Sequence, residues 1–458
     1  MNSGSDYKKD LVEIFSAAVK RVDPESMLLT QCRLDESLFT VSLPDNKVEY
    51  DLSAYARVII IGTGKATARM AKAVEAILGD WITEGLITVK YGHTEELSII
   101  KTIESGHPVP DENSVKAAEQ IISLARSADE KTLVINLISG GGSALLCLPF
   151  GNDDQQCSLA DKQETTKLLL ECGAEIAEIN TIRKHLSGIK GGRLAEAIYP
   201  ADVLNLILSD VIGDRLDSIA SGLTVPDTST FTEAAAITEK YKIKNKLPPA
   251  AGAILEKGLK GEIDETPKQG SPSFEKIRNV LIGTNLAALR SAEAAALKLG
   301  YNTMVLSSQI SGEASEAAKF YLGIGRDIQR DLGMLPRPAC IIAGGETTVT
   351  IRGKGLGGRN QEMALAFLNE LKDMPVGDRS APQIYFLSGG TDGNDGPTDA
   401  AGAFAAVDIA VAGAKAGLSI QKYLDNNDSY NYFKQTGGLL ITGPTNTNVC
   451  DVQIMLVV

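Results

Sequence analysis

The sequence has few cysteines and no paired-cysteine motif. Its six cysteines are scattered along 458 residues, with no two at the spacing of a zinc or redox pair and no histidine cluster beside them. A structural zinc site and a disulfide framework are therefore not expected, and a reducing compartment, the cytoplasm, fits this cysteine usage best.

The sequence also lacks basic runs and long apolar stretches. Its formal charge is -13, and proteins that bind nucleic acid or anionic membranes need clustered Lys and Arg. No apolar stretch approaches the length of a membrane span. The polar N-terminus leads directly into an amphipathic helical pattern, which argues against a cleaved signal peptide. We therefore expect small-molecule substrates and neither a nucleic-acid nor a membrane partner; a homo-oligomer is compatible with the sequence.

Short runs rich in Val and Ile alternate with longer stretches of helical period. This alternation predicts an α/β protein with a largely parallel sheet. The predicted buried strands are Arg57–Ile61, Leu86–Tyr91, Thr132–Ile138, Val203–Leu208, Val280–Gly283, Thr303–Ser307, Ala339–Ala343 and Ile384–Ser388.

The length favours two domains. The polar stretch GEIDETPKQGSPS, residues 261–273, is the best linker candidate, so we predict domains at 1–262 and 263–458. The final GGLLITGPTNTNVCDVQIMLVV has two β-rich runs around a Gly-Pro-Thr-Asn turn, which predicts a terminal hairpin in the second domain.

In VIIIGTGKATARM, a strand ends at a glycine turn and a helix follows. Gly62 and Gly64 flank this turn, and Lys65 begins the helical pattern. Free N–H groups at a helix start, together with a lysine, favour an anion. Neither common nucleotide motif fits, because Ala66 replaces the Ser or Thr of a P-loop and Thr67 replaces the third glycine of the dinucleotide fingerprint. A tight turn with a solvated lysine is about as compatible with this stretch alone.

A second glycine turn follows the strand VINLI. Gly140, Gly141 and Gly142 lie between Ser139 and Ser143, where the chain leaves the carboxyl edge of the predicted sheet. Ligands bind at that edge in open α/β sheets, and the serines can donate to carboxylate or phosphate oxygens. The alternative is a flexible surface loop.

Two charged segments follow. The stretch NTIRKHLSGIKGGRL holds five potential cations, which suggests an anion site, although a solvated helix face explains most of them: Arg183, Lys184, His185, Lys190 and Arg193. Asp210 comes just after a very apolar strand, where a carboxylate is costly without a metal ion or a partner that shares its proton. Asp214 and Asp217 are interpreted as helix caps.

The second half contains a phosphate-type loop and a carboxylate loop. A strand, a turn at 344–346 and a second strand precede a glycine loop that includes Gly357 and Gly358, and Arg359 begins the next helix. The rigid fork of arginine suits a phosphoryl group in transfer. Asp392, Asp395 and Asp399 then lie among glycines, but Gly396 breaks the calcium-loop pattern. A carboxylate loop beside a phosphate loop is what a magnesium nucleotide requires.

Six motifs occur in the order in which they occur in a known family: GTGKA, SGGGSALL, LSDVIGD, GGETTVTIRGKGLGGRNQE, SGGTDGNDGPTDAAGA and TGPTNTNVCD. From about residue 7 to its end, the chain resembles the glycerate 2-kinases of the MOFRL type. The resemblance implies ATP- and Mg²⁺-dependent phosphorylation of D-glycerate at its 2-hydroxyl. It also implies two α/β domains, the first Rossmann-like with a mainly parallel sheet and the second smaller with a mixed sheet, and an active site in the cleft between them.

The same resemblance implies catalytic roles for Lys65, Asp210 and Arg359. Lys65 and Arg359 are expected at the transferring phosphoryl group, and Asp210 either accepts the hydroxyl proton or holds magnesium. The glycine turns, with Ser139 and Ser143, are expected to bind substrate or phosphate: Gly62, Gly64, Gly140, Gly141, Gly142, Gly357 and Gly358. Asp392 and Asp395 are the metal candidates. Two rivals are an NAD(P)-dependent hydroxypyruvate reductase, which needs the dinucleotide fingerprint that is lacking, and a non-catalytic anion-binding module.

Overall fold

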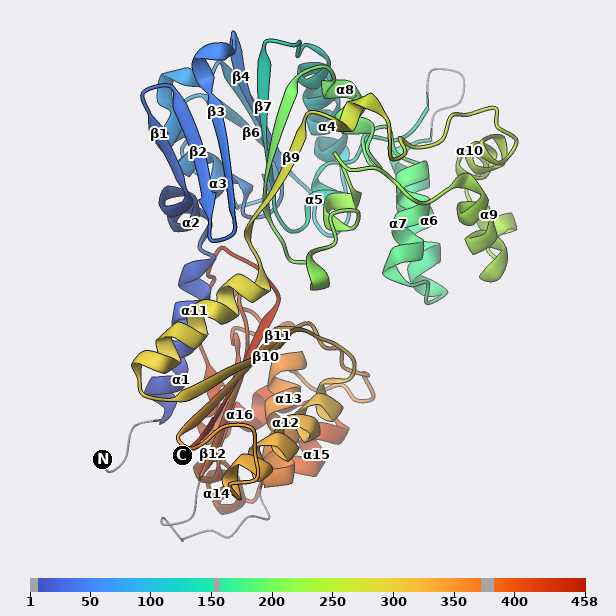
Figure 1. The fold of residues 1–458 in the computed structure, drawn as a ribbon. Helices are drawn as coiled ribbons and strands as arrows, with labels where there is room; N and C mark the ends of the chain where they lie inside the picture. Colours follow the sequence, from blue (N-terminus) through green and yellow to red (C-terminus); the bar gives the residue numbers. More distant parts are fainter. Residues whose placement is uncertain (1–6, 152–156, 372–382) are drawn as a thin grey trace. The chain divides into compact units, whose positions relative to one another are not determined.

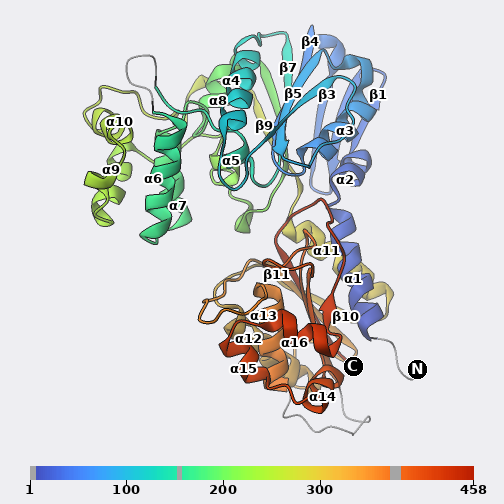
Figure 2. The ribbon, with the colours of Figure 1, turned by 180° about the vertical axis from the view of Figure 1, so that it is seen from behind.

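The computed structural model describes residues 7–151, 157–371 and 383–458 and divides into two compact units. One unit is Pro24–Ile282, and the other combines Met1–Asp23 with Gly283–Val458. Each unit contains a six-stranded sheet with helices against it (Figures 1 and 2). The predicted α/β class is confirmed.

The sheet of the first unit is a doubly wound, mainly parallel sheet. Its strand order is β6-β5-β4-β7-β8-β9, and the neighbours from β6 to β8 run parallel. The strands are β4 (Arg57–Thr63), β5 (Glu84–Lys90), β6 (Ile100–Ser105), β7 (Thr132–Ile138), β8 (Asp202–Leu208) and β9 (Ile277–Gly283). After β4 the chain builds outward through β5 and β6, then returns to add β7 on the other side. The direction of winding therefore reverses between β4 and β7, and in such sheets ligands bind at this reversal.

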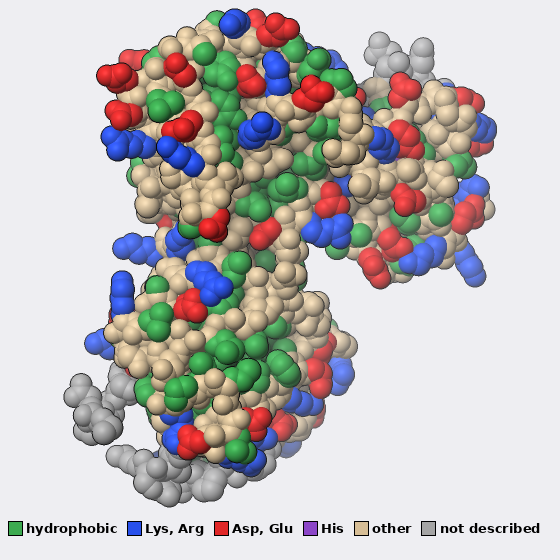
Figure 3. Space-filling model, viewed as in Figure 1, with side chains coloured by type: hydrophobic (Ala, Val, Ile, Leu, Met, Phe, Trp, Pro, Cys, Tyr) green, Lys and Arg blue, Asp and Glu red, His purple; other side chains and the backbone are tan. Residues whose placement is uncertain are grey.

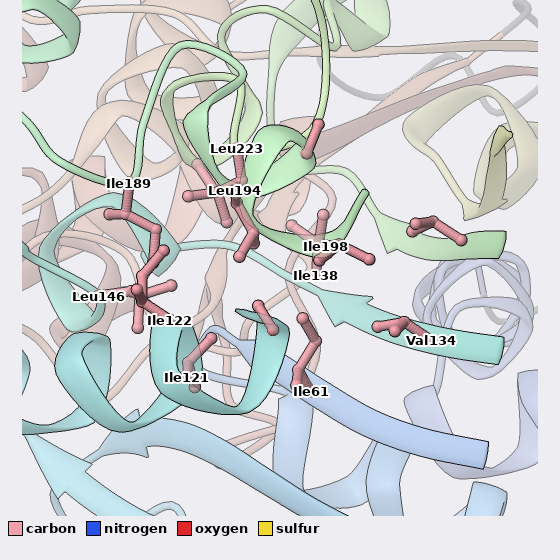
Figure 4. Close-up of a cluster of buried hydrophobic side chains, with 14 of the residues drawn as sticks. Ile61, Ile121, Ile122, Val134, Ile138, Leu146, Ile189, Leu194, Ile198 and Leu223 are labelled. Atoms are coloured by element: carbon pink, nitrogen blue, oxygen red, sulfur yellow. The ribbon is translucent and has the colours of Figure 1, made fainter. Parts of the chain in front are cut away.

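Hydrophobic side chains on one side of this sheet form a core with two helices (Figure 4). Ile61 and Ile138, near the ends of β4 and β7, contribute to it together with Ile121 of α4 (Glu112–Arg126) and Ile198 of α8 (Arg193–Ile198). Burying each such side chain stabilises the fold by about 1.5–3 kcal/mol. Because this core includes Ile61, close to the end of β4, and Ile138, the last residue of β7, it helps to fix the position of the turns that follow these strands.

Two further groups complete the first unit. A three-stranded antiparallel meander, which the sequence did not predict, packs near α2 (Pro24–Gln31) and α3 (Thr67–Leu78). Its strands are β1 (Cys32–Asp35), β2 (Leu38–Leu43) and β3 (Asn46–Asp51). Four helices form a separate group with its own apolar core (Figure 2): α6 (Leu159–Glu171), α7 (Ile176–His185), α9 (Phe231–Lys240) and α10 (Pro249–Leu259).

The second unit has a mixed sheet, as the family resemblance implied. Its order is β10-β11-β15-β12-β13-β14, with only β10 and β11 parallel among the printed pairs. The strands are β10 (Asn302–Ile310), β11 (Ala339–Gly345), β12 (Ile384–Gly390), β13 (Gly402–Ala405), β14 (Leu439–Leu440) and β15 (Asp451–Val457). Helices α1 (Tyr7–Arg21) and α11 (Asn285–Lys298) pack together against this sheet (Figure 1). The remaining helices of this unit are α12 (Ala314–Gln329), α13 (Arg359–Leu371), α14 (Val407–Lys415), α15 (Ile420–Asp425) and α16 (Ser429–Thr436).

The structure corrects two strand predictions in this unit. The terminal hairpin is wrong, because β15 lies between β11 and β12 while β14 pairs with β13 at the sheet edge. All seven residues of β15 are buried. A buried strand needs partners for its backbone N–H and C=O groups on both edges, and two neighbouring strands supply them. The strand expected after Glu346 is also absent from this described part of the chain, which forms only an isolated bridge between Thr348 and Glu313.

The observed units divide the chain differently from the predicted 1–262 and 263–458. Residues 263–282 belong to the first unit, and the N-terminal segment belongs to the second. The expected linker packs into the first unit, where the Thr266 hydroxyl donates to the Asp227 carboxylate at 2.9 Å. In the second unit, the Tyr301 hydroxyl donates to Asp10 of α1 at 2.7 Å. Polar composition therefore marked an irregular segment rather than a domain boundary.

Acidic and basic side chains are interspersed on the face shown in Figure 3. Lys and Arg do not form a continuous basic patch on that face, in keeping with the net negative charge of the chain. Among the described residues, we find no helix long and apolar enough to cross a membrane.

Candidate active site

The first glycine turns of the sequence meet at the reversal between β4 and β7. The N–H of Ser139 donates to the Thr63 carbonyl at 3.0 Å, and the N–H of Lys65 donates to the Gly140 carbonyl at 2.9 Å. Lys65 is thus fixed by its backbone to the turn that follows β7. The sequence predicted each turn, and the parallel pairing of β4 with β7 brings them together.

Close packing of the two turns explains Gly62, Gly64 and Ser139. A β-carbon on Gly64 would collide with the Ser139 hydroxyl, and one on Gly62 would lie 2.6 Å from the Leu137 carbonyl oxygen. The Ser139 hydroxyl accepts the Ala66 N–H at 3.1 Å, just before α3. These three residues therefore hold the turns in place, and their role in binding substrate or phosphate stays a prediction.

The second turn carries Gly141, whose φ of 85° is a left-handed conformation that glycine adopts without strain. A β-carbon there would lie 3.0 Å from Nε2 of His107 and 3.1 Å from Cε of Lys65. Gly142 begins the short helix α5 (Gly142–Leu145), and the Ser143 hydroxyl lies 2.7 Å from the Ser221 hydroxyl. Gly141 therefore lets Lys65 and His107 approach the same stretch of backbone.

Asp210 follows β8 and lies against the same turn. A β-carbon on Gly140 would collide with its carboxylate, so only glycine allows this approach. Burial raises the pKa of Asp210 above its ordinary value, and the positive charge of Lys65 acts in the opposite direction. A carboxylate of raised basicity, a lysine and a glycine turn thus come together in the first unit: Asp210, Lys65 and Gly140.

His107 belongs to this group but was not predicted. Burial, followed by the charges of Lys65 and Lys90, lowers the pKa of His107 to about 4, so the ring is neutral at pH 7. A neutral imidazole can donate or accept a hydrogen bond without adding charge. Its local sequence, SGHPVP, has no pattern that indicates proximity to Lys65, because the contact depends on the pairing of β5 with β6 and of β4 with β7.

In the second unit, Arg359 begins α13 and is held by two carboxylates. Its Nε and Nη2 donate to Asp451 at 2.6 and 3.0 Å, and Nη1 lies 2.9 Å from Glu346. The Asp451 side chain is fully buried, whereas that of Arg359 is 33% exposed. Burial opposes the charge of Arg359, but the bonds to Asp451 outweigh it and raise the pKa. The guanidinium is therefore fixed in orientation by two carboxylates, while the side chain stays partly exposed; sequence reasoning missed Asp451.

Asp395 stabilises the first turn of α13. Its carboxylate accepts the N–H groups of Asn360 at 3.1 Å and Gln361 at 2.8 Å, and burial raises its pKa to about 6. Glycine is needed beside it, because a β-carbon on Gly358 would collide with this carboxylate and one on Gly357 with the Ser429 hydroxyl. These contacts account for Asp395, Gly357 and Gly358 without a metal ion or a phosphate.

Replacing Asp395 by alanine is expected to lower the free energy of unfolding by about 0.5–2 kcal/mol, the usual cost of losing a helix cap. Asp395→Asn keeps an acceptor oxygen and should lose less. Urea unfolding measures both variants. We also expect the Mg²⁺ concentration for half-maximal activity to be unchanged in Asp395→Asn; a clear increase would make Asp395 a metal ligand instead.

Asp392 is the more accessible of the two predicted metal residues. An ideal β-carbon on Gly390 would lie 3.2 Å from Oδ1 of Asp392 and 3.6 Å from Oδ1 of Asp451, so both carboxylates flank this glycine. Asp399 instead accepts the Tyr430 hydroxyl at 2.7 Å. Within the described ranges, no group of three or more His, Cys, Asp or Glu could hold a metal ion. A magnesium ion here would thus depend largely on substrate oxygens, as is usual for nucleotide sites.

The cations of residues 183–193 are not on a solvated face, contrary to the interpretation preferred from sequence. Lys184 is buried and pairs with Asp227 at 3.1 Å, and the buried His185 lies 3.1 Å from Glu265. Lys190 is also buried. Their partners lie about 40 to 80 residues away along the chain, so sequence spacing could not reveal them.

Two family models match this chain. The model described as a domain of unknown function (DUF4147) matches residues 10–256, and that of the MOFRL family matches residues 339–451. Among relatives, the D-glycerate 2-kinase of Thermotoga maritima is 41% identical over 95% of this chain and 100% of that protein. A protein of Agrobacterium vitis that carries the name hydroxypyruvate reductase is also 41% identical, over 98% of this chain and 94% of its own.

A solved structure shows the same fold. The crystal structure of glycerate kinase from Thermotoga maritima matches with a TM-score of 0.85 and 39% identity, covering 99% of both chains. The similarity spans both units, and the matched family models cover the segments that carry Lys65, Asp210 and Arg359. This chain therefore belongs to the MOFRL-type family of glycerate kinases.

Proposed function

We propose that this protein is a glycerate 2-kinase, which transfers the terminal phosphoryl group of ATP to the 2-hydroxyl of D-glycerate and releases ADP and 2-phosphoglycerate. The observation that carries the proposal is the meeting of Lys65 and Asp210 at the glycine turn of Gly140, where winding of the parallel sheet reverses. The names of full-length relatives support the same reaction.

We assign Asp210 as the general base that accepts the proton of the 2-hydroxyl of D-glycerate. In the transfer step, the 2-hydroxyl oxygen bonds to the terminal phosphorus, the bond from that phosphorus to the ADP oxygen breaks, and the hydroxyl proton passes to a carboxylate oxygen of Asp210. Burial raises the pKa of this carboxylate, so it holds a proton more strongly than an exposed aspartate does. The alternative role, a magnesium ligand, uses the same carboxylate in its ionised form.

Lys65 supplies positive charge where negative charge gathers on the transferring group. Phosphoryl transfer requires alignment and charge neutralisation more than covalent chemistry. The lysine is well suited because its backbone is bonded to the Gly140 carbonyl and its side chain packs beside Gly141. We assign Arg359 to the same phosphoryl group, because its side chain is partly exposed and lies in the motif GGRNQE.

The residues present suit magnesium bound together with a nucleotide. Mg²⁺ usually takes one or two carboxylates and completes its shell with phosphate oxygens and water. Asp392, with Asp451 beside it across Gly390, is the pair that we assign. When bound, the ion neutralises phosphate charge. Its requirement is tested by titrating Mg²⁺ against activity in Asp392→Asn.

The reductase name of one relative makes a second function worth testing. A dinucleotide enzyme of this fold uses a third glycine where the helix begins, but α3 begins at Thr67. The purified protein should release ADP when given ATP and D-glycerate, and should not oxidise NADH or NADPH in the presence of hydroxypyruvate. Oxidation of either cofactor without ADP release would replace this proposal with the reductase.

Replacing Lys65 by methionine is expected to lower kcat by about 10²- to 10³-fold, the range for removing one preorganised group that stabilises transition-state charge. Steady-state kinetics with ATP and D-glycerate measure this. Lys72→Met is a matched control, because Lys72 lies on α3, the helix that follows Lys65, and pairs with Glu95 at 3.2 Å. Equal loss in both variants would mean that net charge, and not the position of Lys65, matters.

We also propose that the protein is cytoplasmic and that its partners are small molecules rather than nucleic acids. The six cysteines all lie in the described residues and form no disulfide with one another, which agrees with a reducing compartment.

A further inference from the structure

A small cavity with three positively charged side chains lies behind the glycine turn of the first unit. Its volume is about 210 Å³, and its lining includes Gly141 and Ser143 together with Lys162, Arg183 and Lys190. Lys162 comes from α6, Arg183 from α7, and Lys190 from the loop that follows α7. We call these three cations and the space between them the cationic pocket.

The charges of the cationic pocket are buried without a carboxylate. Lys162 is 7% exposed and Lys190 2% exposed, and none of the described lining residues is acidic. The ammonium of Lys162 donates to the Leu186 carbonyl at 2.8 Å, and that of Lys190 to the Leu146 carbonyl at 2.6 Å. These carbonyls satisfy hydrogen bonds but do not neutralise charge. The neighbouring Lys184, in contrast, has Asp227 as its partner.

Such an arrangement is costly without a negative charge to balance it. Burial lowers the pKa of Lys190 to about 7, and the charges of Lys162 and Arg183 act in the same direction. Burial likewise lowers the pKa of Lys162 and of Arg183. A bound anion would lower this cost by neutralising the cluster.

We infer that the cationic pocket binds the carboxylate of the acceptor and that Arg183, Lys162 and Lys190 thereby select 2-hydroxy acids over neutral alcohols. This inference rests on the proposed kinase function. The carboxylate of a 2-hydroxy acid is attached to the carbon that carries the reacting hydroxyl, so it must be bound close to the site of transfer. Gly141 lines the pocket and also contacts the side chain of Lys65, which gives this closeness.

A carboxylate fits the pocket better than a nucleotide does. A volume of about 210 Å³ is below the roughly 300–1,000 Å³ of sites for drug-sized ligands, whereas glycerate has only a few heavy atoms. The planar guanidinium of Arg183 can donate two parallel hydrogen bonds to a carboxylate, and Lys162 and Lys190 add point charges. Selection of an acid over an alcohol is strong in such a site, because the neutral ligand leaves buried charges uncompensated.

The first test is kinetic. Arg183→Gln and Lys162→Met are expected to raise KM for D-glycerate about 10- to 100-fold each, the effect of losing one charged hydrogen bond, while KM for ATP changes less than about threefold. The preference for D-glycerate over glycerol should narrow by the same factor. Lys167→Met is the matched control, since Lys167 lies on the same α6 helix with its side chain 63% exposed. An unchanged KM for D-glycerate in both pocket variants would overturn the inference.

The second test measures binding without catalysis. In thermal unfolding without nucleotide, D-glycerate should raise the Tm of the wild-type protein, glycerol should not, and the shift should be lost in Arg183→Gln. Arg183→Lys, which keeps the charge without the fork, should show a smaller shift and serves if the glutamine variant does not fold. A larger shift with inorganic phosphate than with D-glycerate would make this a phosphate site and overturn the inference. A glycerate shift that depends on Arg183 in a protein without kinase activity would support the pocket while refuting the proposed function.

Discussion

Asp210→Asn is expected to reduce kcat for D-glycerate by about 10²- to 10⁴-fold, the contribution of a positioned general base. Asparagine has nearly the same shape as aspartate, so it fits beside Gly140, where a β-carbon would collide with the Asp210 carboxylate. It cannot take the proton of the acceptor hydroxyl at neutral pH. Steady-state kinetics measure the loss, and the Tm shows whether the variant is folded.

The pH profile distinguishes this role from a structural one. Because burial raises the pKa of Asp210, activity in the wild-type protein should fall on the acid side at a pH above the usual aspartate value, as the carboxylate becomes protonated. This limb should disappear from the residual activity of Asp210→Asn. Asp217→Asn is the control, since Asp217 pairs with the exposed Arg215 at 2.8 Å and should keep most activity. Near wild-type turnover in Asp210→Asn would rule out proton transfer to this residue.

Arg359→Ala is expected to lose both stability and activity. It leaves the fully buried Asp451 carboxylate without its partner, and breaking a buried pair costs about 3–5 kcal/mol. We expect the lower end, because the Arg359 side chain is one-third exposed and partly screened by water. Denaturant unfolding measures the stability, and kcat should fall at least about 10²-fold.

A second variant separates these two effects. The double variant Arg359→Met with Asp451→Asn removes both charges of the pair, so most of the stability should return, which isolates the cost of the unpaired carboxylate. Arg359→Lys should also stay poorly active, because lysine keeps the charge but lacks the fork that Asp451 orients. Near wild-type activity in Arg359→Lys would show that the guanidinium does not act on the phosphoryl group.

The sequence predicted those parts of the fold that depend on local pattern. Buried runs such as Thr132–Ile138 appear as β7 with the same bounds, because an apolar stretch of this length is read correctly without knowledge of its neighbours. Local pattern does not predict which strands pair with one another. The last strand, β15, takes a central place between β11 and β12, which are supplied by distant segments, so the adjacent β14 is not its partner.

The same contrast between local pattern and distant pairing holds for the residues of the candidate active site. The turns at Gly64 and Gly140 were evident from sequence, and the topology of the sheet brings them together with Asp210. Partners contributed by distant segments were missed: His107 beside Lys65, and Asp451 on Arg359. Asp395 was predicted as a metal residue because a carboxylate among glycines resembles a metal loop. Its hydrogen bonds to the first turn of α13 give it a second role that the sequence does not show. A side chain that caps a helix 34 residues away leaves no local pattern.

The central claim is that the protein phosphorylates the 2-hydroxyl of D-glycerate, and the position of the phosphoryl group on the product tests it most directly. The product formed from ATP and D-glycerate is examined by ³¹P NMR with proton coupling retained. The account predicts a phosphorus coupled to the single proton on C2, hence 2-phosphoglycerate, with ADP in equal amount. A phosphorus coupled to the two protons on C3, or no phosphorylated product at all, would contradict it.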